Sequence, residues 1–286
     1  MKVEDLLGRM RCPSCGAGNV ARTGDTAVCS NCGTRLPIDG NSVSGAIGSV
    51  LSGEWEEMQA GSVERYQDEH YEEDETIALI FGGFIAVTLK PSDVVFDIGC
   101  GLFPEMPAYA RDLQMAGYIG LEPLTTKVER DYVCMTGAVA EKLPLKDKSF
   151  DAILLATSLD HIEHVDQAMA ELKRVLTPGG RIYIWCGLHE PEVQAHAKTF
   201  HSIFYGTRGL KKVARIAAAY AEYGHFAWRM HKRRRALGKG ERLDSAHFRY
   251  YTRPTLRKEL TDNGLVIRRE LLVPGSVSML VEAVPA

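Results

Sequence analysis

Four of the seven cysteines are grouped within the first forty residues in a pattern that suits a metal ion. They form two Cys-x-x-Cys-Gly pairs, Cys12–Gly16 and Cys29–Gly33. Two intervening residues let one tight turn direct both thiolates at one ion, and the glycine lets the backbone turn back toward the sulfurs. Two such pairs would complete a closed tetrahedral site, with rubredoxin-like iron or a redox dithiol as alternatives. The expected ligands of a structural Zn²⁺ are Cys12, Cys15, Cys29 and Cys32.

The bulk composition is that of a globular chain with nearly balanced charge. It has 286 residues, of which 45% are hydrophobic, and a formal net charge of -3. No apolar run approaches the ~20 residues of a membrane-spanning helix, and Met1–Met10 lacks the apolar centre of a signal peptide. We therefore expect a cytoplasmic protein with one large and one small domain.

The chain divides into three regions by composition. Residues 1–40 are expected to form a zinc ribbon, and residues 41–90 a linker with N-terminal helices. Pro37–Gly53, which spans the boundary between these two regions, is rich in Gly, Ser and Asn and is typical of a loop. Glu54–Tyr71 and Asp74–Leu89 have helical patterns. Residues 91–286 are expected to form the main domain.

Short apolar runs alternate with amphipathic helices from Ser92 onward, which predicts a doubly wound, mostly parallel α/β sheet. A helix starting near Pro104 and another over His164–Leu176 separate some of these runs. A Thr-Pro-Gly-Gly turn should then lead into the fifth strand. The five runs are Val94–Asp97, Tyr118–Glu122, Tyr132–Met135, Phe150–Ala156 and Arg181–Cys186.

The C-terminal end of the chain predicts an antiparallel hairpin. Thr252–Asn263 has a helical pattern closed by Gly264. Two strands, Leu265–Val273 and Ser276–Val284, follow and are joined by a tight Pro-Gly turn. A parallel sheet that ends in such a hairpin differs from the dinucleotide-binding dehydrogenase arrangement.

Four motifs occur in one order: VVFDIGCG at Val94–Gly101, YIGLEP at Tyr118–Pro123, the stretch Ala140–Ile162, and LKRVLTPGGRIYIW at Leu172–Trp185. With these motifs, Ser92–Val284 resembles the class I S-adenosylmethionine (SAM)-dependent methyltransferases, especially the type 11 group. The resemblance implies a Rossmann-like, mostly parallel seven-stranded sheet with a C-terminal antiparallel hairpin. A dehydrogenase would instead require Gly-x-Gly-x-x-Gly, where this chain has Gly-Cys-Gly-Leu-Phe-Pro.

The resemblance also implies a cofactor site. Asp97 would hold the amino end of the methionine moiety, and Glu122 would accept hydrogen bonds from the ribose hydroxyls. Phe103 replaces the usual third glycine and Val139 the usual adenine-binding Asp, so Glu141 or a backbone carbonyl would take that contact. The expected cofactor-binding residues are Asp97, Gly99, Cys100, Gly101, Glu122, Pro123, Ala140, Glu141 and Thr157. The scattered cysteines Cys100, Cys134 and Cys186 are interpreted as buried packing residues.

A general base is needed only if the methyl acceptor must lose a proton early. His161 follows the fourth strand and His189 follows the fifth, where ligands of such sheets bind, so these two residues are the catalytic candidates. The structural interpretation stays open, with His164 in the first turn of a helix and Asp160 as its cap.

Residues 188–247 form an insertion whose segment 208–242 is strongly basic. Gly209–Tyr223 has the pattern of an amphipathic helix, and Phe226, Trp228 and Met230 lie beside the basic run His231–Arg235. Three interpretations remain: a solvated face, an anionic membrane surface, or RNA.

The predicted function is methyl transfer from SAM to an oxygen or nitrogen atom of an unidentified small molecule, glycan or lipid-linked intermediate, or RNA. The alternative is a non-catalytic protein of the same fold that binds RNA or a protein partner through the zinc ribbon and the basic insertion.

Overall fold

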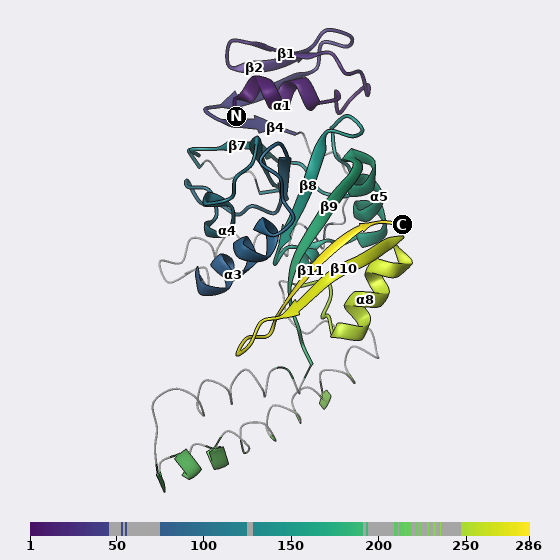
Figure 1. Cartoon of the computed structure of the whole chain (residues 1–286). Coiled ribbons are helices and arrows are strands. Elements are labelled where there is room, and N and C mark those ends of the chain that lie inside the picture. Colours follow the sequence, from purple (N-terminus) through teal and green to yellow (C-terminus); the bar gives the residue numbers. More distant parts are fainter. Residues whose placement is uncertain are drawn as a thin grey trace.

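The computed structural model describes residues 1–45, 75–124, 128–190 and 247–286, with single residues and short pieces of 46–74 and 191–246. The described strands form one 11-stranded sheet in the order β1-β2-β3-β4-β7-β6-β5-β8-β9-β11-β10 (Figure 1). The sheet therefore runs without interruption from the N-terminal cysteine-rich region to the C-terminal hairpin.

Seven of these strands form the doubly wound sheet that the sequence predicts. β5 to β9 are mutually parallel, and β11 pairs antiparallel with β9 and β10, which confirms the terminal hairpin. The bounds are β5 Val94–Ile98, β6 Gly117–Glu122, β7 Val133–Thr136, β8 Phe150–Ala156, β9 Leu176–Gly187, β10 Leu265–Leu272 and β11 Ser278–Pro285.

Two local predictions in this region are wrong. The helix expected near Pro104 is a single turn, α4 (Ala108–Arg111), because the proline-bearing segment before it forms bends rather than helix. The Thr-Pro-Gly-Gly segment does not precede the fifth strand but lies inside β9, which begins at Leu176. Gly179 adopts φ +81 there, and the pairing with β8 shifts register across the segment. The Thr-Pro-Gly-Gly segment is thus accommodated by an irregularity within β9, similar to a β-bulge.

The expected linker over Pro37–Gly53 is also wrong at its N-terminal end. That region contains β3 (Arg35–Asp39) and β4 (Ser42–Ser44), an antiparallel pair joined by Gly40 at φ +55 and Asn41. A Gly-Asn pair is a hairpin signal, which the high content of small polar residues concealed. β4 then pairs in parallel with β7 and so attaches the N-terminal module to the main sheet. The module's other strands are β1 (Val20–Thr23) and β2 (Thr26–Cys29).

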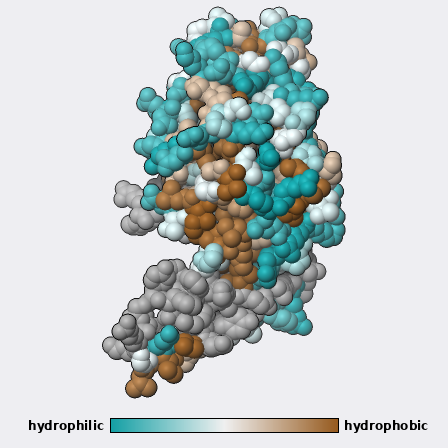
Figure 2. Space-filling model, viewed as in Figure 1, coloured by the Kyte–Doolittle hydropathy of each residue, from teal (hydrophilic) through white to brown (hydrophobic). Residues whose placement is uncertain are grey.

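Helices cover both faces of the sheet (Figure 1). On one face, α3 (Glu75–Ala86) and α4 pack over a core that includes Phe81 and Tyr183. On the other face lie α5 (Val165–Val175) and α8 (Arg253–Asp262), which bury Leu172 and Leu260. Figure 2 shows apolar side chains gathered on part of the surface, and the exposed apolar residues of the described chain include Leu79, Ile80 and Val87 on and after α3.

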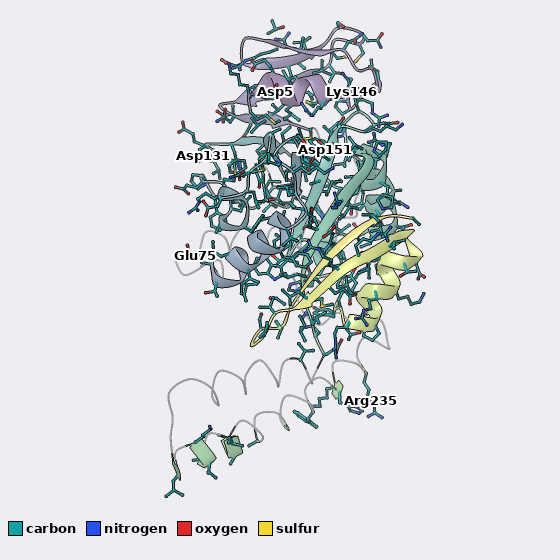
Figure 3. The ribbon with its side chains drawn as sticks, in the orientation of Figure 1. Asp5, Glu75, Asp131, Lys146, Asp151 and Arg235 are labelled. Carbon is teal, nitrogen blue, oxygen red and sulfur yellow. The ribbon has the colours of Figure 1, made fainter. Side chains whose placement is uncertain are left out.

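The N-terminal helix α1 (Val3–Arg9) belongs to the same core as the main domain. Its residue Leu6 is fully buried in the cluster that also contains Leu145. The chain after α1 pairs with the segment 144–146: the Arg11 N–H donates to the Pro144 carbonyl at 2.9 Å, and the Lys146 N–H donates to the Arg9 carbonyl at 2.7 Å. The Lys146 side chain adds a bond to the Gly8 carbonyl, beside α1 in Figure 3.

Several predictions fall outside the described residues. The expected helix Glu54–Tyr71 lies outside them except at Trp55, and so does most of the insertion. Described pieces of Gly209–Tyr223 are helical, with Val213 exposed, and Arg235 in the basic run is exposed as well (Figure 3). Within the described chain, no helix is long and apolar enough to cross a membrane.

Candidate functional site

A cavity of about 340 Å³ lies where β5, β6 and β8 reach their carboxyl ends. This is the edge at which open α/β sheets bind ligands, and the volume is in the range of small-molecule pockets. Six of the nine predicted cofactor residues line it: Gly99, Glu122, Pro123, Ala140, Glu141 and Thr157. Both catalytic candidates, His161 and His189, line it as well. The other three predicted residues, Asp97, Cys100 and Gly101, are buried but are not among the residues that line the cavity.

The turn after β5 is shaped by its glycines. Gly99 and Gly101 adopt φ +76 and +82, and the Gly99 N–H donates to the Leu121 carbonyl at 2.8 Å. A Cβ atom on Gly99 would lie 2.7 Å from the Cβ of Ser158, so position 99 admits no side chain without movement of the β8 end. The turn therefore brings bare backbone to the cavity wall.

Glu122 ends β6 as a buried carboxylate at the edge of the cavity. Its two oxygens accept separate backbone bonds, from the Gly101 N–H and from the Leu124 N–H, at 3.0 Å each. Burial raises the pKa of Glu122 to about 7, although these N–H groups and the Arg130 guanidinium oppose the shift. Each carboxylate oxygen has a second lone pair, so Glu122 can still accept hydrogen bonds from a ligand in the cavity.

Asp97 is fully buried and does not line the cavity. Its Oδ2 atom accepts bonds from the phenols of Tyr109, at 2.7 Å, and Tyr118, at 2.5 Å. Burial, followed by the charge of Asp97, raises the pKa of Tyr118 well above its ordinary value. In this structure Asp97 therefore ties α4 and β6 to the glycine turn of β5. Cys100 is also buried here, 3.8 Å from Cys134 between the sulfur atoms, in agreement with its predicted packing role.

The segment 139–141 forms the wall opposite the glycine turn. Val139, where the family resemblance led us to expect an Asp, is buried and lines the cavity with Ala140. Glu141 accepts the N–H groups of Glu163, at 3.1 Å, and His164, at 3.3 Å. Glu141 thus fixes the backbone just before α5, where no side chain of the described residues caps the helix, so the open possibility of a cap by Asp160 is not realised. Burial raises the pKa of Glu141. Its position on the wall is compatible with a ligand contact in addition.

Thr157 follows β8 in a conformation that is rare for a β-branched residue, with φ +52. The Trp185 carbonyl accepts its N–H at 2.8 Å and holds this conformation. Such backbone outliers concentrate at ligand sites, and this one lies on the cavity lining.

Three histidines meet at the other end of the cavity. His161 ends the 3₁₀ turn η1 (Leu159–His161), His189 follows β9, and His247 comes from the far end of the insertion. The ring centroids of His161 and His247 are 4.7 Å apart, and those of His189 and His247 are 6.5 Å apart. Asp160 lies beside them and is buried. The cavity thus has a glycine-and-carboxylate end and a histidine end.

Comparisons with known proteins agree with this geometry. The family model described as a methyltransferase domain, Methyltransf_11, matches residues 96–184. These are the residues that build the cavity from β5 to β9. Residues 96–184 form a methyltransferase domain of class I fold.

Individual relatives of this methyltransferase domain match over a limited part of their length. The ubiquinone/menaquinone biosynthesis C-methyltransferases UbiE of Burkholderia mallei and Burkholderia thailandensis are 32% identical over 106 residues, which is 34% of this chain and 44% of theirs. The chain therefore matches less than half of these relatives' length. The solved structure of a Burkholderia thailandensis 1,6-didemethyltoxoflavin-N1-methyltransferase, with its substrate and S-adenosylhomocysteine bound, has a TM-score of 0.52 at 14% identity, over 93% of this chain and 98% of that one. At this level of sequence identity, the likeness shows a shared fold and nothing about the substrate.

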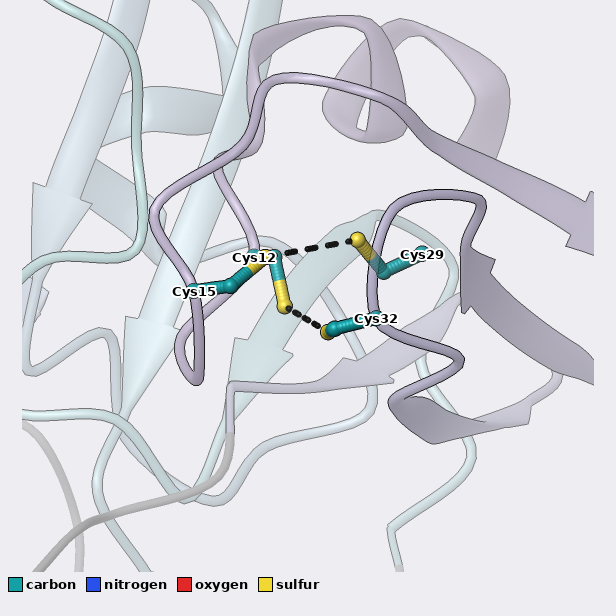
Figure 4. A group of neighbouring side chains, drawn as sticks. All are labelled: Cys12, Cys15, Cys29 and Cys32. Atoms are coloured by element: carbon teal, nitrogen blue, oxygen red, sulfur yellow. Dashed lines mark hydrogen bonds between the residues drawn. The ribbon is translucent and has the colours of Figure 1, made fainter.

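The four N-terminal cysteines meet in space as their spacing predicts (Figure 4). The sulfur atoms of Cys12 and Cys32 are 3.6 Å apart and those of Cys15 and Cys29 are 3.7 Å apart. Four sulfurs at ~2.3 Å from a tetrahedral Zn²⁺ lie about 3.8 Å from one another, so the cluster fits the ion.

The turn around Cys12 favours its thiolate. The N–H groups of Gly16 and Gly33, at φ +73 and +75, return to the carbonyls of Cys12 and Cys29 at 2.8 and 2.9 Å. Burial works against ionisation of Cys12, but the backbone N–H groups of Cys15 and Ser14 and a bond from Thr34 outweigh it and lower the pKa of Cys12 to about 6. The pKa of Cys15 is lowered as well, chiefly by a bond from the Asn31 side chain. The backbone N–H of Cys32 lowers the pKa of Cys29, but burial and the neighbouring sulfur atoms of Cys12 and Cys15 outweigh it and raise that pKa.

Two cavity residues were missed by sequence reasoning. Trp55 lines the cavity and is buried, yet it stands alone in an acidic stretch whose pattern gave no reason to single it out. His247 appeared only as the end of the insertion. Asp160 and His247 are separated by the whole insertion, so the sequence carries no local signal of their proximity.

Proposed function

We propose that this protein transfers a methyl group from SAM to an acceptor that enters the histidine end of the cavity. The observation that carries the proposal is the cavity itself, which the residues of the family motifs line at the carboxyl ends of β5, β6 and β8. When bound, SAM would supply an electrophilic methyl group on a sulfonium, and the chain would supply proximity, alignment and exclusion of water.

The cofactor would occupy the glycine-and-carboxylate end of the cavity. Gly99 offers bare backbone there, and Glu122 offers lone pairs to ribose hydroxyls. Asp97 would act at one remove, because two phenols already engage its Oδ2 atom and it does not line the cavity. The apolar wall of Val139 and Ala140 would contact the adenine ring, with Glu141 or a backbone carbonyl accepting from its amino group.

The positions of His161 and His189 support the proposal that the methyl acceptor binds at the histidine end of the cavity. Both reach the cavity from strand ends, where a side chain can approach a substrate without disturbing the sheet. Either imidazole could accept a proton from an oxygen or nitrogen acceptor. The relatives carry the name C-methyltransferase, so carbon joins oxygen and nitrogen among the acceptor atoms to be tested.

The zinc module is part of the same proposal as a structural element. Four thiolates leave no open coordination position, so the ion would stabilise the module and would not contact substrate. The basic segment 208–242 would contact RNA or an anionic membrane surface near the acceptor. The exposed side chains of His231, Lys232 and Arg235 support that role, as does the Lys232 ammonium 4.3 Å from the Trp228 ring centroid.

The decisive experiment is calorimetric titration of zinc-loaded protein with SAM and S-adenosylhomocysteine. We expect micromolar binding of both, and transfer of labelled methyl from SAM to one pool in a screen of small molecules, lipid-linked glycans and RNA. Folded, metal-replete protein that binds neither ligand would refute the proposal. The non-catalytic alternative would then gain weight, and it predicts a polyanion complex that weakens steeply with salt.

A further inference from the structure

Three segments far apart in the sequence, around residues 160–163, 189 and 247–251, are joined by hydrogen bonds to main-chain groups at the histidine end of the cavity. The Phe248 N–H donates to the Asp160 carbonyl at 2.9 Å, and the His189 N–H donates to the Tyr251 carbonyl at 2.8 Å. The Arg249 guanidinium adds bonds to the carbonyls of Ile162, at 2.7 Å, and Glu163, at 3.0 Å. The backbone therefore fixes where the side chains of positions 160, 161 and 247 meet.

Possible metal-ligand atoms of these three residues lie close together there, but too far apart for hydrogen bonds between them. The Nε2 atom of His161 is 4.0 Å from Oδ1 of Asp160, and Nε2 of His247 is 3.8 Å from Oδ2 of the same carboxylate. Three potential ligand atoms of these residues all lie within 4.8 Å of one another. Ligands about 2.1 Å from one ion lie roughly 3.0–4.2 Å apart, depending on coordination geometry. Small side-chain rotations would bring this set to that spacing.

The carboxylate of Asp160 supplies an independent observation. Asp160 is 7% exposed, and its Oδ1 atom accepts no hydrogen bond from the part of the chain that the structure describes. A buried carboxylate oxygen without a donor is costly unless a cation compensates it. The guanidinium of Arg249, on the same segment as His247, is engaged with main-chain carbonyls and with Glu259 instead.

We propose that Asp160, His161 and His247 form a site for a divalent transition-metal ion at the acceptor end of the cavity. Two imidazoles and one carboxylate suit Fe²⁺, Co²⁺, Mn²⁺ or Zn²⁺ and leave coordination positions open. All three residues line the cavity, so the open positions would face it. His161 then serves as a ligand, and the role of proton acceptor falls to His189. The use of the ion in methyl transfer rests on the proposed function, whereas the ion site rests on its own donor set.

Co²⁺ titration of the full-length protein tests the site. The protein is first loaded with zinc and treated with a weak chelator until metal analysis finds one zinc per chain, held by the four thiolates. We expect one further equivalent of Co²⁺ to bind, with visible d–d bands and without the intense sulfur-to-cobalt absorption of a thiolate site. Asp160→Asn and His247→Gln should each weaken Co²⁺ binding at least about tenfold. His164→Gln is the matched control, because this half-exposed histidine lies outside the cluster, and it should bind Co²⁺ as the unaltered protein does.

Calorimetry with S-adenosylhomocysteine on the same samples separates this proposal from the proposed function and reports that each variant is folded. Cofactor binding without a second equivalent of Co²⁺ would overturn the metal site alone. A second equivalent that persists unchanged in both Asp160→Asn and His247→Gln would also overturn it. Co²⁺ binding that is lost in these two variants, while S-adenosylhomocysteine binding is retained, would support it.

Discussion

Replacing Glu122 by Gln should change how the stability of the cofactor-free protein depends on pH. Burial raises the pKa of Glu122 from 4.5 to about 7, which corresponds to about 3 kcal/mol at ~1.4 kcal/mol per unit. The folded chain then holds a proton that the unfolded chain releases near pH 4.5. The stabilisation from this group is therefore complete below pH ~4.5 and is lost as the pH rises through ~7. About 2.5 kcal/mol of that loss falls between pH 5 and pH 8.

The glutamine side chain of the Glu122→Gln variant cannot ionise, so the variant lacks this loss. Its amide accepts only through the carbonyl oxygen, and its NH₂ group would face one of the two N–H donors, of Gly101 or Leu124. That costs about 1–3 kcal/mol at every pH and must be separated from the charge effect. The quantity to compare is therefore the difference in unfolding free energy between variant and wild type, measured by urea denaturation at pH 5 and at pH 8.

We expect that difference to move by about 2.5 kcal/mol in favour of Glu122→Gln between the two pH values. S-adenosylhomocysteine affinity at pH 8 should fall at least about tenfold, because the amide has fewer lone pairs for ribose hydroxyls. Glu105→Gln is the matched control, since Glu105 is exposed shortly after the glycine turn, and it should change neither quantity. A stability difference that is the same at pH 5 and pH 8 would refute the raised pKa of the buried Glu122.

Three further perturbations test the structure around the site. Asp97→Ala removes the acceptor of the buried phenols of Tyr109 and Tyr118 and should lower the free energy of unfolding by about 3–5 kcal/mol; a loss below ~1 kcal/mol in urea denaturation would contradict this. Cys32→Ser should abolish zinc binding by metal analysis and lower the melting temperature, and retention of stoichiometric zinc would be contrary to the four-thiolate site. Leu6→Ala should cost about 3 kcal/mol in a single unfolding transition, whereas a separate early transition would mean that the N-terminal module folds independently.

The arrangement of the main sheet could be predicted because its strands are buried on both faces. Phe150–Ala156 is apolar at every position except Asp151 and is bounded by polar residues, and its predicted bounds agree with β8. The short strands of the N-terminal module gave no comparable signal. Val43 is the one fully buried apolar side chain of β4, between two serines, so the strand is recognisable only by its pairing with β7.

The candidate site also contains residues whose positions the sequence predicts and residues whose positions it does not. Gly99 and Glu122 belong to motifs in which a local conformation and a strand end fix the position of the residue, so their place on the cavity was predictable. Asp97 shares the first motif, but no spacing rule predicts that the phenols of Tyr109 and Tyr118 bind its carboxylate. His247 reaches Asp160 only through long-range main-chain bonds, which a single sequence does not encode locally.

The N-terminal module also covers what would otherwise be an exposed edge of the main sheet. β7 would otherwise be an edge strand with unpaired main-chain groups, a site of aggregation in many proteins. β4 pairs with β7, and β3, β2 and β1 continue the sheet into the module that the four cysteines hold together.

The same module reaches the cavity wall. Residues 9–11 pair with 144–146, and only two residues separate Pro144 from Glu141 on the lining. Because Glu141 also binds the backbone just before α5, release of zinc would loosen the edge of the sheet, the docking of α1 and one wall of the cavity together. A four-thiolate site with no role in chemistry would thus still influence cofactor affinity, through the backbone that it anchors.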